Sequence, residues 1–298
     1  MCDILGICPV DIGQWLSYQP YSNQEQIILQ KENLISTPLI NKEGTVKFIY
    51  SKTIDDLEKY LENISSQIKI KDTEIALESE IFYTTKIEGA KTTRIRTTEI
   101  HNGAPISLNN EYSERMVKNG FEAVKLLKLY GKKITEDILL KTWNTLVDNV
   151  CNNEEKRGTK YRNGDIQVGS YVGLEHSKVQ NSMNKWIEFY NSDQLNDKPF
   201  LKTAILHYSF ETIHPFCDGN GRLGRLMMNH YLIGQNIEST KMVSFSKNMD
   251  QNRALYDASF VNAENRENDC TPFLQYMLET MANSFEEIYQ FQQQEIDF

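Results

Sequence analysis

The sequence predicts an all-α protein that carries one small β-hairpin. Through most of the 298 residues, apolar side chains recur at spacings of three and four, which is typical of one buried helix face. The pattern changes only near Asn163-Gly164, a dipeptide that favours a hairpin turn between two short extended runs. No internal repeat or low-complexity linker marks a domain boundary.

The first third of the chain predicts an irregular arm followed by two helices. Residues 1 to about 50 contain three prolines among scattered aromatic residues, which indicates an arm packed on a larger body. Apolar spacing predicts a helix over 51–70. Asp72-Thr73 then predicts the cap of a second helix, which runs toward Glu88-Gly89, where the glycine favours a stop.

The remaining elements follow from the same spacing and from turn residues. The hairpin is expected over 160–168, with its turn at Asn163-Gly164, and the end of the chain after Phe285 is rich in glutamine and is expected to fray. Helices are expected over 111–130, 135–147, 179–190, 199–213, 222–233, 250–263 and 272–285.

Composition excludes several classes of function. The net charge of −9 has the wrong sign for tracking phosphates, so nucleic acid is not expected as a partner. The five cysteines include no closely spaced pair of the zinc or redox type, which indicates reduced thiols. No signal peptide or membrane span is apparent, so a soluble, cytoplasmic protein without a membrane partner is expected.

The stretch from His214 to Arg225 concentrates polar chemistry between two predicted helices. Pro215 helps to end the first helix, and Gly219 and Gly221 allow backbone conformations in which successive N–H groups converge on an anion. The second helix begins at about the same point and adds its free N–H groups and positive dipole end. This arrangement predicts a phosphate cradle.

Side chains of the same stretch fit nucleotide chemistry. Arg222 and Arg225, three positions apart, could clamp phosphate oxygens bidentately. Asp218 suits a Mg²⁺ ion that bridges those phosphates, and His214, whose ordinary pKa is near neutrality, suits a general base for an attacking hydroxyl. Together these groups predict a nucleotide transferase.

The same region contains two patterns that are typical of other kinds of site. The glycine pattern of residues 219–224 matches a dinucleotide-binding fingerprint, but it follows a helix rather than a strand, which disfavours that fold. His207, Glu211 and His214 fall on one face of a helix and leave a metal site open as a minor alternative.

Residues 214–225, read as His-Pro-Phe-x-Asp-Gly-Asn-Gly-Arg-x-x-Arg, resemble the signature of the Fic (Fido) family of AMP-transferring enzymes. The resemblance extends over roughly residues 80–285 and implies a helical bundle with a small β-hairpin flap. On this basis the chain divides into an N-terminal helical region, 1–110, with an inhibitory helix at about 73–89, a Fic/Fido catalytic core, 111–285, and a C-terminal tail, 286–298.

The resemblance also implies a role for each motif residue. His214 would deprotonate a Ser, Thr or Tyr hydroxyl of a target protein, Phe216 would anchor the loop, and Asp218 would hold Mg²⁺. ATP would be the AMP donor, and its phosphates would bind Gly219, Asn220, Gly221, Arg222 and Arg225. The predicted flap, with Ile166, Gln167 and Val168, would dock an extended target segment, and Tyr256 would contact the adenine.

Thr84 to Gly89 resemble the inhibitory motif of the family, in which a hydroxyl residue is followed by three residues and then Glu-Gly. Glu88 would pair with Arg225 and place a carboxylate where the γ-phosphate must lie, and Gly89 would end the helix. The leading hypothesis is therefore an autoinhibited protein adenylyltransferase, with self-modification and homo-oligomers as further expectations. A hydrolase that removes AMP through the same site, or a nucleotide-binding regulator with negligible turnover, remains an alternative.

Overall fold

The computed structural model describes residues 34–150, 161–168, 171–264, 266 and 268–295. The part of the predicted irregular arm before residue 34 lies outside the described residues. Within them, no helix is both long and apolar enough to cross a membrane.

Helices dominate the described chain, as the apolar spacing predicts, and two short antiparallel hairpins accompany them. The strands are β1 Leu34–Asn41, β2 Gly44–Ile49, β3 Gln167–Val168 and β4 Tyr171–Val172. The α-helices are α3 Lys52–Gln67, α4 Thr73–Ile87, α5 Arg94–His101, α6 Glu111–Tyr130, α7 Glu136–Val147, α8 His176–Asn191, α9 Pro199–Ile213, α10 Asn220–Gly234, α11 Phe245–Gln251, α12 Arg253–Glu264 and α13 Thr271–Gln294. Two short 3₁₀ segments are η1 Leu108–Asn110 and η3 Glu238–Met242.

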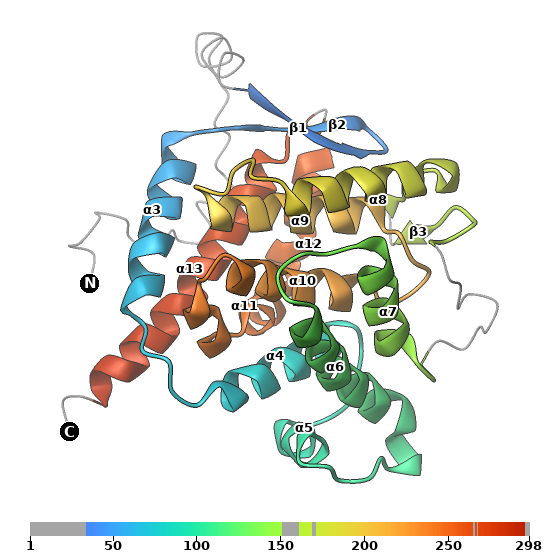
Figure 1. The fold of residues 1–298 in the computed structure, drawn as a ribbon, viewed down its shortest axis with the longest axis vertical. Helices are drawn as coiled ribbons and strands as arrows, with labels where there is room; N and C mark the ends of the chain where they lie inside the picture. The colour runs from blue at the N-terminus through green and yellow to red at the C-terminus, as the bar shows by residue number, and fades with distance from the viewer. Residues whose placement is uncertain (1–33, 151–160, 169–170, 265, 267, 296–298) are drawn as a thin grey trace.

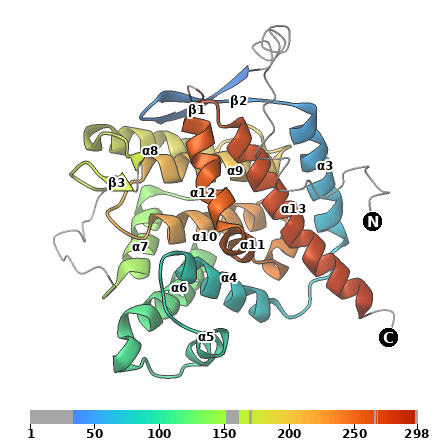
Figure 2. The same ribbon diagram turned by 180° about the vertical axis from the view of Figure 1, so that it is seen from behind.

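Helix α9 forms the centre of the bundle (Figure 1). Its side chains from Phe200 to Ile213 are all buried except Glu211, as expected for a helix that is covered on every side. Helix α10 packs antiparallel beside it after the connecting loop, and α13 packs against α3, α9, α11 and α12. Figure 2 shows α13 crossing the bundle from the opposite side. The loop of residues 214–219 is thus held between two central helices.

Helix α4 contacts α5, α6, α10 and α11. It begins where the sequence predicts, because the side chain of Asp72 accepts a hydrogen bond from the N–H of Glu74. Gly120 on α6 allows a close approach, since a Cβ there would lie 3.0 Å from the Ile81 side chain of α4. These contacts seat the C-terminal end of α4 against the start of α10.

The prediction of an irregular arm up to residue 50 is wrong for residues 34–50. There β1 pairs with β2, and Lys42-Glu43 lies between the paired residues Asn41 and Gly44. The strands alternate, with Thr37, Leu39, Val46 and Phe48 buried, so a period of two was available in the sequence. Backbone hydrogen bonds of Lys47 to Asn268 and Cys270 connect β2 to the chain just before α13.

Other boundaries also differ from the prediction. The second hairpin turns between Val168 and Tyr171, so the prediction of a turn at Asn163-Gly164 is wrong. Helix α5 was not predicted, and the single helix expected over 250–263 is preceded by a separate helix, α11. Helix α13 continues to Gln294 instead of fraying after Phe285, because the buried Gln292 side chain bonds the backbone of Lys69 at both its amide atoms.

Candidate active site

The loop between α9 and α10 begins with a left-handed residue at the predicted base. His214 has φ 50° and ψ 65°, a conformation that few non-glycine residues adopt, and its N–H still bonds Phe210 O at 2.9 Å. Strained backbone of this kind persists only where its surroundings hold it, and it concentrates at functional sites. This left-handed turn at His214 ends α9, and the loop begins there.

Phe216 anchors the loop in the core, as the family resemblance implies. Its buried ring stacks on Trp143 of α7, with ring centroids 4.3 Å apart and planes 8° from parallel. The Trp143 indole N–H donates to Asp218 O at 2.8 Å. One tryptophan therefore holds the loop at two points.

Asn220 closes the loop with its side chain. The amide oxygen accepts from Phe216 N at 2.9 Å, and the amide nitrogen donates to Phe216 O at 2.8 Å. Both ends of the buried amide are therefore occupied by the loop backbone. Of the groups of Asn220, only the backbone N–H at the start of α10 remains suited to the predicted anion hole.

The sequence predicts a phosphate cradle at the start of α10. Gly219 has φ 80° and is the residue just before the helix, where a side chain would be strained. Asp218 Oδ1 accepts from Gly219 N at 2.6 Å and from Arg222 Nη2 at 2.9 Å. Arg222 is buried, and its Nε has no hydrogen-bond partner among the described residues, which leaves one donor for a ligand oxygen.

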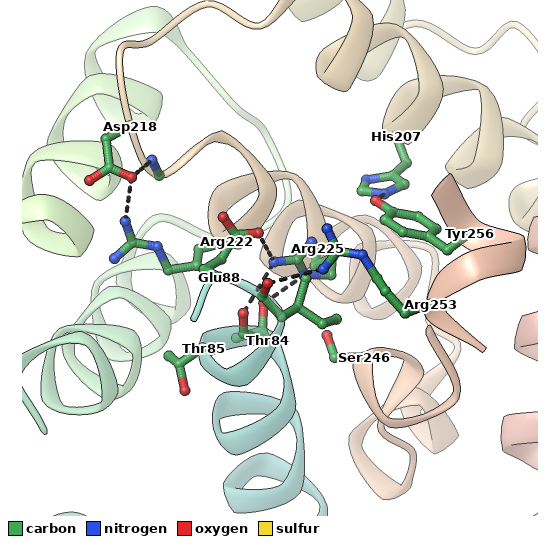
Figure 3. Close-up of polar contacts among 12 residues, drawn as sticks. Thr84, Thr85, Glu88, His207, Asp218, Arg222, Arg225, Ser246, Arg253 and Tyr256 are labelled. Carbon is green, nitrogen blue, oxygen red and sulfur yellow. Dashed lines mark hydrogen bonds and ion pairs between the residues drawn. The ribbon is translucent and has the colours of Figure 1, made fainter. Parts of the chain in front are cut away.

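Arg225 lies one turn further along α10 and is bound by α4 (Figure 3). Its Nε donates to Thr84 Oγ1 at 2.8 Å, and its Nη2 donates to Glu88 Oε1 at 2.6 Å and to Thr84 O at 3.2 Å. Only 2% of the Arg225 side chain is exposed, against 28% for Glu88. Residues that the sequence separates by more than 130 positions thus meet as predicted.

The carboxylate of Glu88 also covers the first turn of α10. A Cβ added at Gly221 would overlap Glu88 Oε1, so the carboxylate lies directly against that glycine. Gly89, with φ 89°, follows Glu88 in a left-handed conformation and ends the segment. The space where the sequence predicts a phosphate is therefore lined by a carboxylate in this structure.

Charges and burial set the protonation states at the site. Burial alone would raise the pKa of Glu88, but the nearby Arg225 charge and hydrogen bond lower it on balance. Burial lowers the pKa of His214 to about 4, with a further lowering by the charge of Arg162. At neutral pH the Glu88 carboxylate is charged, and the His214 imidazole is neutral and able to accept a proton.

Arg162 is a component of the site that the sequence gave no reason to select. Its side chain is completely buried and donates from Nε to His214 O at 2.8 Å and from Nη1 to Gly164 O at 2.7 Å. Nη2 donates to Leu174 O and, at 3.3 Å, to Ile213 O. These acceptors are backbone carbonyls, which every residue carries, so the residue types in the sequence do not indicate the contacts. Arg162 joins the base of the β3–β4 hairpin to the strained turn at His214.

The expected flap residues lie at the second hairpin, whereas the expected adenine residue lies in the core. Gln167 and Val168 form β3, while Ile166 precedes the strand and accepts a hydrogen bond from Gly173 N at 3.0 Å. Tyr256 lies in the interior, where its hydroxyl is 2.9 Å from His207 Nε2 and only 4% of the residue is exposed. This position is in the core rather than on an open surface where adenine could stack.

Asp218 is the side chain of this site that fits a metal ion. Among the described residues, no three His, Cys, Asp or Glu side chains converge on one point, so the alternative of a site built from His207, Glu211 and His214 is not supported. Asp218 keeps 35% of its side chain exposed, and its recorded hydrogen bonds all use Oδ1. One accessible carboxylate fits Mg²⁺, which commonly takes one or two carboxylates together with substrate phosphates.

The candidate site combines a loop between two central helices, a neutral histidine and two buried arginines, a set of groups that suits an anionic ligand. A sequence model of the Fic/DOC family matches residues 133–232. The chain is 35% identical over 77 residues, 26% of its length and 15% of the relative's, to protein adenylyltransferase Fic of Drosophila mojavensis. It is 23% identical over 221 residues, 72% of its length and 42% of the relative's, to protein adenylyltransferase fic-1 of Caenorhabditis elegans.

Solved structures show the same fold. A Fic family protein from Desulfovibrio desulfuricans superposes with a TM-score of 0.71 at 21% identity, covering 80% of this chain and 75% of that one. Fic-1 from C. elegans superposes with a TM-score of 0.63 at 19% identity, covering 82% and 72%. The chain thus matches the Fic/DOC family model over residues 133–232, and it shares the fold of these solved structures. The matched region spans less than half the length of each of these two curated relatives.

Proposed function

We propose that this protein is a protein adenylyltransferase that moves AMP from ATP to a Ser, Thr or Tyr hydroxyl of a target protein and is held inactive by Glu88. Relatives named protein adenylyltransferase support the reaction class. The observation that carries the proposal is the Glu88 carboxylate, which lies against Gly221 and on Arg225 at the start of α10. This site already accommodates an anionic oxygen of the kind a phosphate would present.

His214 is the proposed catalytic base. Its neutral imidazole takes the proton of the target hydroxyl as the hydroxyl oxygen attacks the α-phosphorus of ATP. A new O–P bond joins AMP to the target, the bond between the α-phosphorus and the bridging oxygen breaks, and pyrophosphate leaves. Arg162 acts as a positioning residue, because it holds the His214 carbonyl and thereby the left-handed turn.

The cradle stabilises the charge that the phosphates carry. The backbone N–H groups of Asn220 and Gly221 lie in the first turn of α10, where a negative charge is favoured, whereas the N–H of Gly219 already bonds Asp218. Arg222 and Arg225 supply guanidinium donors in a buried setting, where such hydrogen bonds are stronger than in water. Mg²⁺ held by Asp218 would neutralise phosphate charge when bound.

Inhibition follows from competition for the same donors. Glu88 uses Nη2 of Arg225, and its carboxylate covers Gly221, so the γ-phosphate of ATP cannot take its place while α4 stays docked. The Glu88 carboxylate and the γ-phosphate would repel each other by several kcal/mol at short range. This repulsion is of the same order as the free energy with which a protein binds a nucleotide. ATP would then bind weakly or with its α-phosphate turned away from His214.

Radiolabelled ATP tests the reaction. Glu88→Gly protein incubated with Mg²⁺ and ATP labelled at the α-phosphate should incorporate label into itself or into an added protein mixture, and ATP labelled at the γ-phosphate should give none. His214→Ala in the same background should remove the α-label. His230→Ala is the matched control, because His230 lies at the far end of α10 and bonds Tyr190 and Gly131. Label from the γ-position alone would refute AMP transfer and indicate a kinase.

A further inference from the structure

Glu211 is a buried carboxyl group that the proposed reaction does not use. It lies on α9 one turn before His214, and its Oε1 is buried without a hydrogen-bond partner among the described residues. It is the one residue between Phe200 and Ile213 that α9 does not bury completely. A polar atom in this state calls for an explanation, because buried acceptors normally have partners.

The position of Glu211 relates it to the inhibitory contact. A Cβ added at Gly224 would collide with Glu211 Oε1, just as a Cβ added at Gly221 would collide with Glu88 Oε1. Gly221 and Gly224 are three residues apart and therefore lie on one face of α10. Two carboxyl groups, one from α4 and one from α9, thus lie on the helix that carries Arg225.

Only one of these two carboxyl groups is paired. Glu88 Oε1 accepts from Arg225 Nη2 at 2.6 Å, whereas Glu211 Oε1 has no hydrogen-bond partner among the described residues. Burial raises the pKa of Glu211 to about 8; the positive charge of Arg225 opposes the rise and the negative charge of Glu88 adds to it. Arg253 and Tyr256 of α12 and His207 of α9 are the other titratable groups near it. Near neutral pH, Glu211 therefore carries a proton while Glu88 supplies the negative charge.

We propose that Glu211 is the reserve counter-ion of Arg225: it holds a proton while Glu88 is docked and releases that proton to solvent when Glu88 withdraws. A buried guanidinium that loses its hydrogen-bonded carboxylate partner is strongly destabilised, and the other buried carboxyl group of α4 near Arg225, Glu80, bonds Ser244 and Ser246 instead. Deprotonation of Glu211 restores a negative charge beside α10 and keeps Arg225 in position. The significance of this role rests on the proposed function, since binding of the γ-phosphate to Arg225 would return the proton to Glu211.

The two carboxyl groups then behave as one coupled titrating pair around a fixed cation. Removal of the Glu88 charge eliminates a contribution that raises the pKa of Glu211 and leaves the opposing charge of Arg225 unbalanced. A Glu211 that only packs against Gly224 would contribute equally to stability whether or not Glu88 is charged, because that packing does not involve α4.

Carboxyl ¹³C NMR without nucleotide tests the proposal directly. In the parent protein, Glu211 should titrate near pH 8. In Glu88→Gln, which keeps the shape of the side chain, it should titrate at least about one pH unit lower. Glu58 is the internal control, because it is buried on α3 and its titration does not depend on Glu88 or Arg225. An unchanged Glu211 titration in Glu88→Gln would overturn the proposal.

A thermal double-mutant cycle gives a second, independent readout. Glu211→Gln resembles the protonated carboxyl, so in the parent it should change Tm by less than about 1 °C at pH 7. In the Glu88→Gln background the same substitution should lower Tm by about 3 °C or more, because Arg225 then has no carboxylate partner. Equal effects in both backgrounds would contradict the reserve role. Neither measurement uses ATP, so their outcome is separate from that of the labelling test.

Discussion

Glu88 and Arg225, 137 positions apart in the sequence, meet through a 2.6 Å ion pair that fastens α4 to α10. The guanidinium is almost fully buried, and Thr84 satisfies a second of its nitrogens from the same helix turn. Such a pair is costly to break on one side only, because the partner left behind is a desolvated charge. The inhibitory contact is consequently a structural bond of the fold as well as a proposed regulator of the site.

Substitution of Glu88 by glycine should activate the protein. The change removes the carboxylate from Gly221 and frees Nη2 of Arg225 for a phosphate, so α-labelled ATP should label protein at least about tenfold faster, which corresponds to about 1.4 kcal/mol. Glu74→Ala, in the exposed first turn of the same helix, is the matched control and should leave labelling at the parent rate. Unchanged labelling in Glu88→Gly would disprove inhibition by this residue.

Thr84 should contribute to inhibition through its hydroxyl. It accepts from Arg225 Nε at 2.8 Å, and hydrogen bonds to charged groups contribute about 1.5–3 kcal/mol. Thr84→Val keeps the shape and removes the acceptor, so it should raise labelling roughly tenfold, whereas Thr84→Ser should behave as the parent. The effect should disappear in the Glu88→Gly background, where α4 no longer blocks the site. An equal increase in that background would show that Thr84 acts elsewhere.

The residues of the candidate site could be selected from the sequence because they are contiguous. Within residues 214–225, the sequence places a candidate base, a carboxylate, glycines and two arginines at spacings that a loop and one helix turn can present together. Helices 111–130 and 199–213 were predictable with both ends, because Gly131, Pro199 and Pro215 coincide with the change in apolar spacing. Contact between Thr84, Glu88 and Arg225 required the family resemblance, since no local pattern joins such distant positions.

The parts that sequence reasoning missed depend on tertiary contacts or on short elements. Arg162 donates hydrogen bonds to backbone carbonyls of three separate segments. The side-chain amide of Asn220 bonds the backbone of Phe216 instead of a ligand. Helix α5 has only eight residues and little apolar periodicity, so it is stabilised by its contacts with α4 and α6. Tyr256 was assigned from the family resemblance, which does not report that its ring is buried in the core.

The pH dependence of the activated enzyme should report the environment of His214. Burial lowers the pKa of its imidazole to about 4, so the neutral, proton-accepting form persists well below the ordinary value of 6.5. For Glu88→Gly, kcat/KM with saturating Mg²⁺ should stay level from pH 8 to about 5.5 and fall only toward pH 4. An acid limb centred near pH 6.5 would show that the imidazole is solvated during catalysis.

Glu58 on α3 should make stability decrease as the pH rises. Its buried carboxyl accepts hydrogen bonds from the N–H groups of Phe200 and Leu201 at the start of α9, and burial raises its pKa to about 7, above the ordinary value of 4.5. Between these two pH values the folded state binds more protons than the unfolded state, so the free energy of unfolding falls as pH increases. The difference between about 7 and 4.5 corresponds to about 3 kcal/mol.

Urea unfolding of the parent and of Glu58→Gln across pH 4.5 to 8 isolates this effect, because all other titrating groups are common to both proteins. The free energy of unfolding of Glu58→Gln, relative to the parent, should rise by up to about 3 kcal/mol over that interval and then level off above pH 7. Glu74→Gln, at an exposed position in the first turn of α4, should show a constant difference. Parallel curves for Glu58→Gln and the parent would mean that the carboxyl is ionised throughout, with the two N–H groups at the start of α9 stabilising its charge.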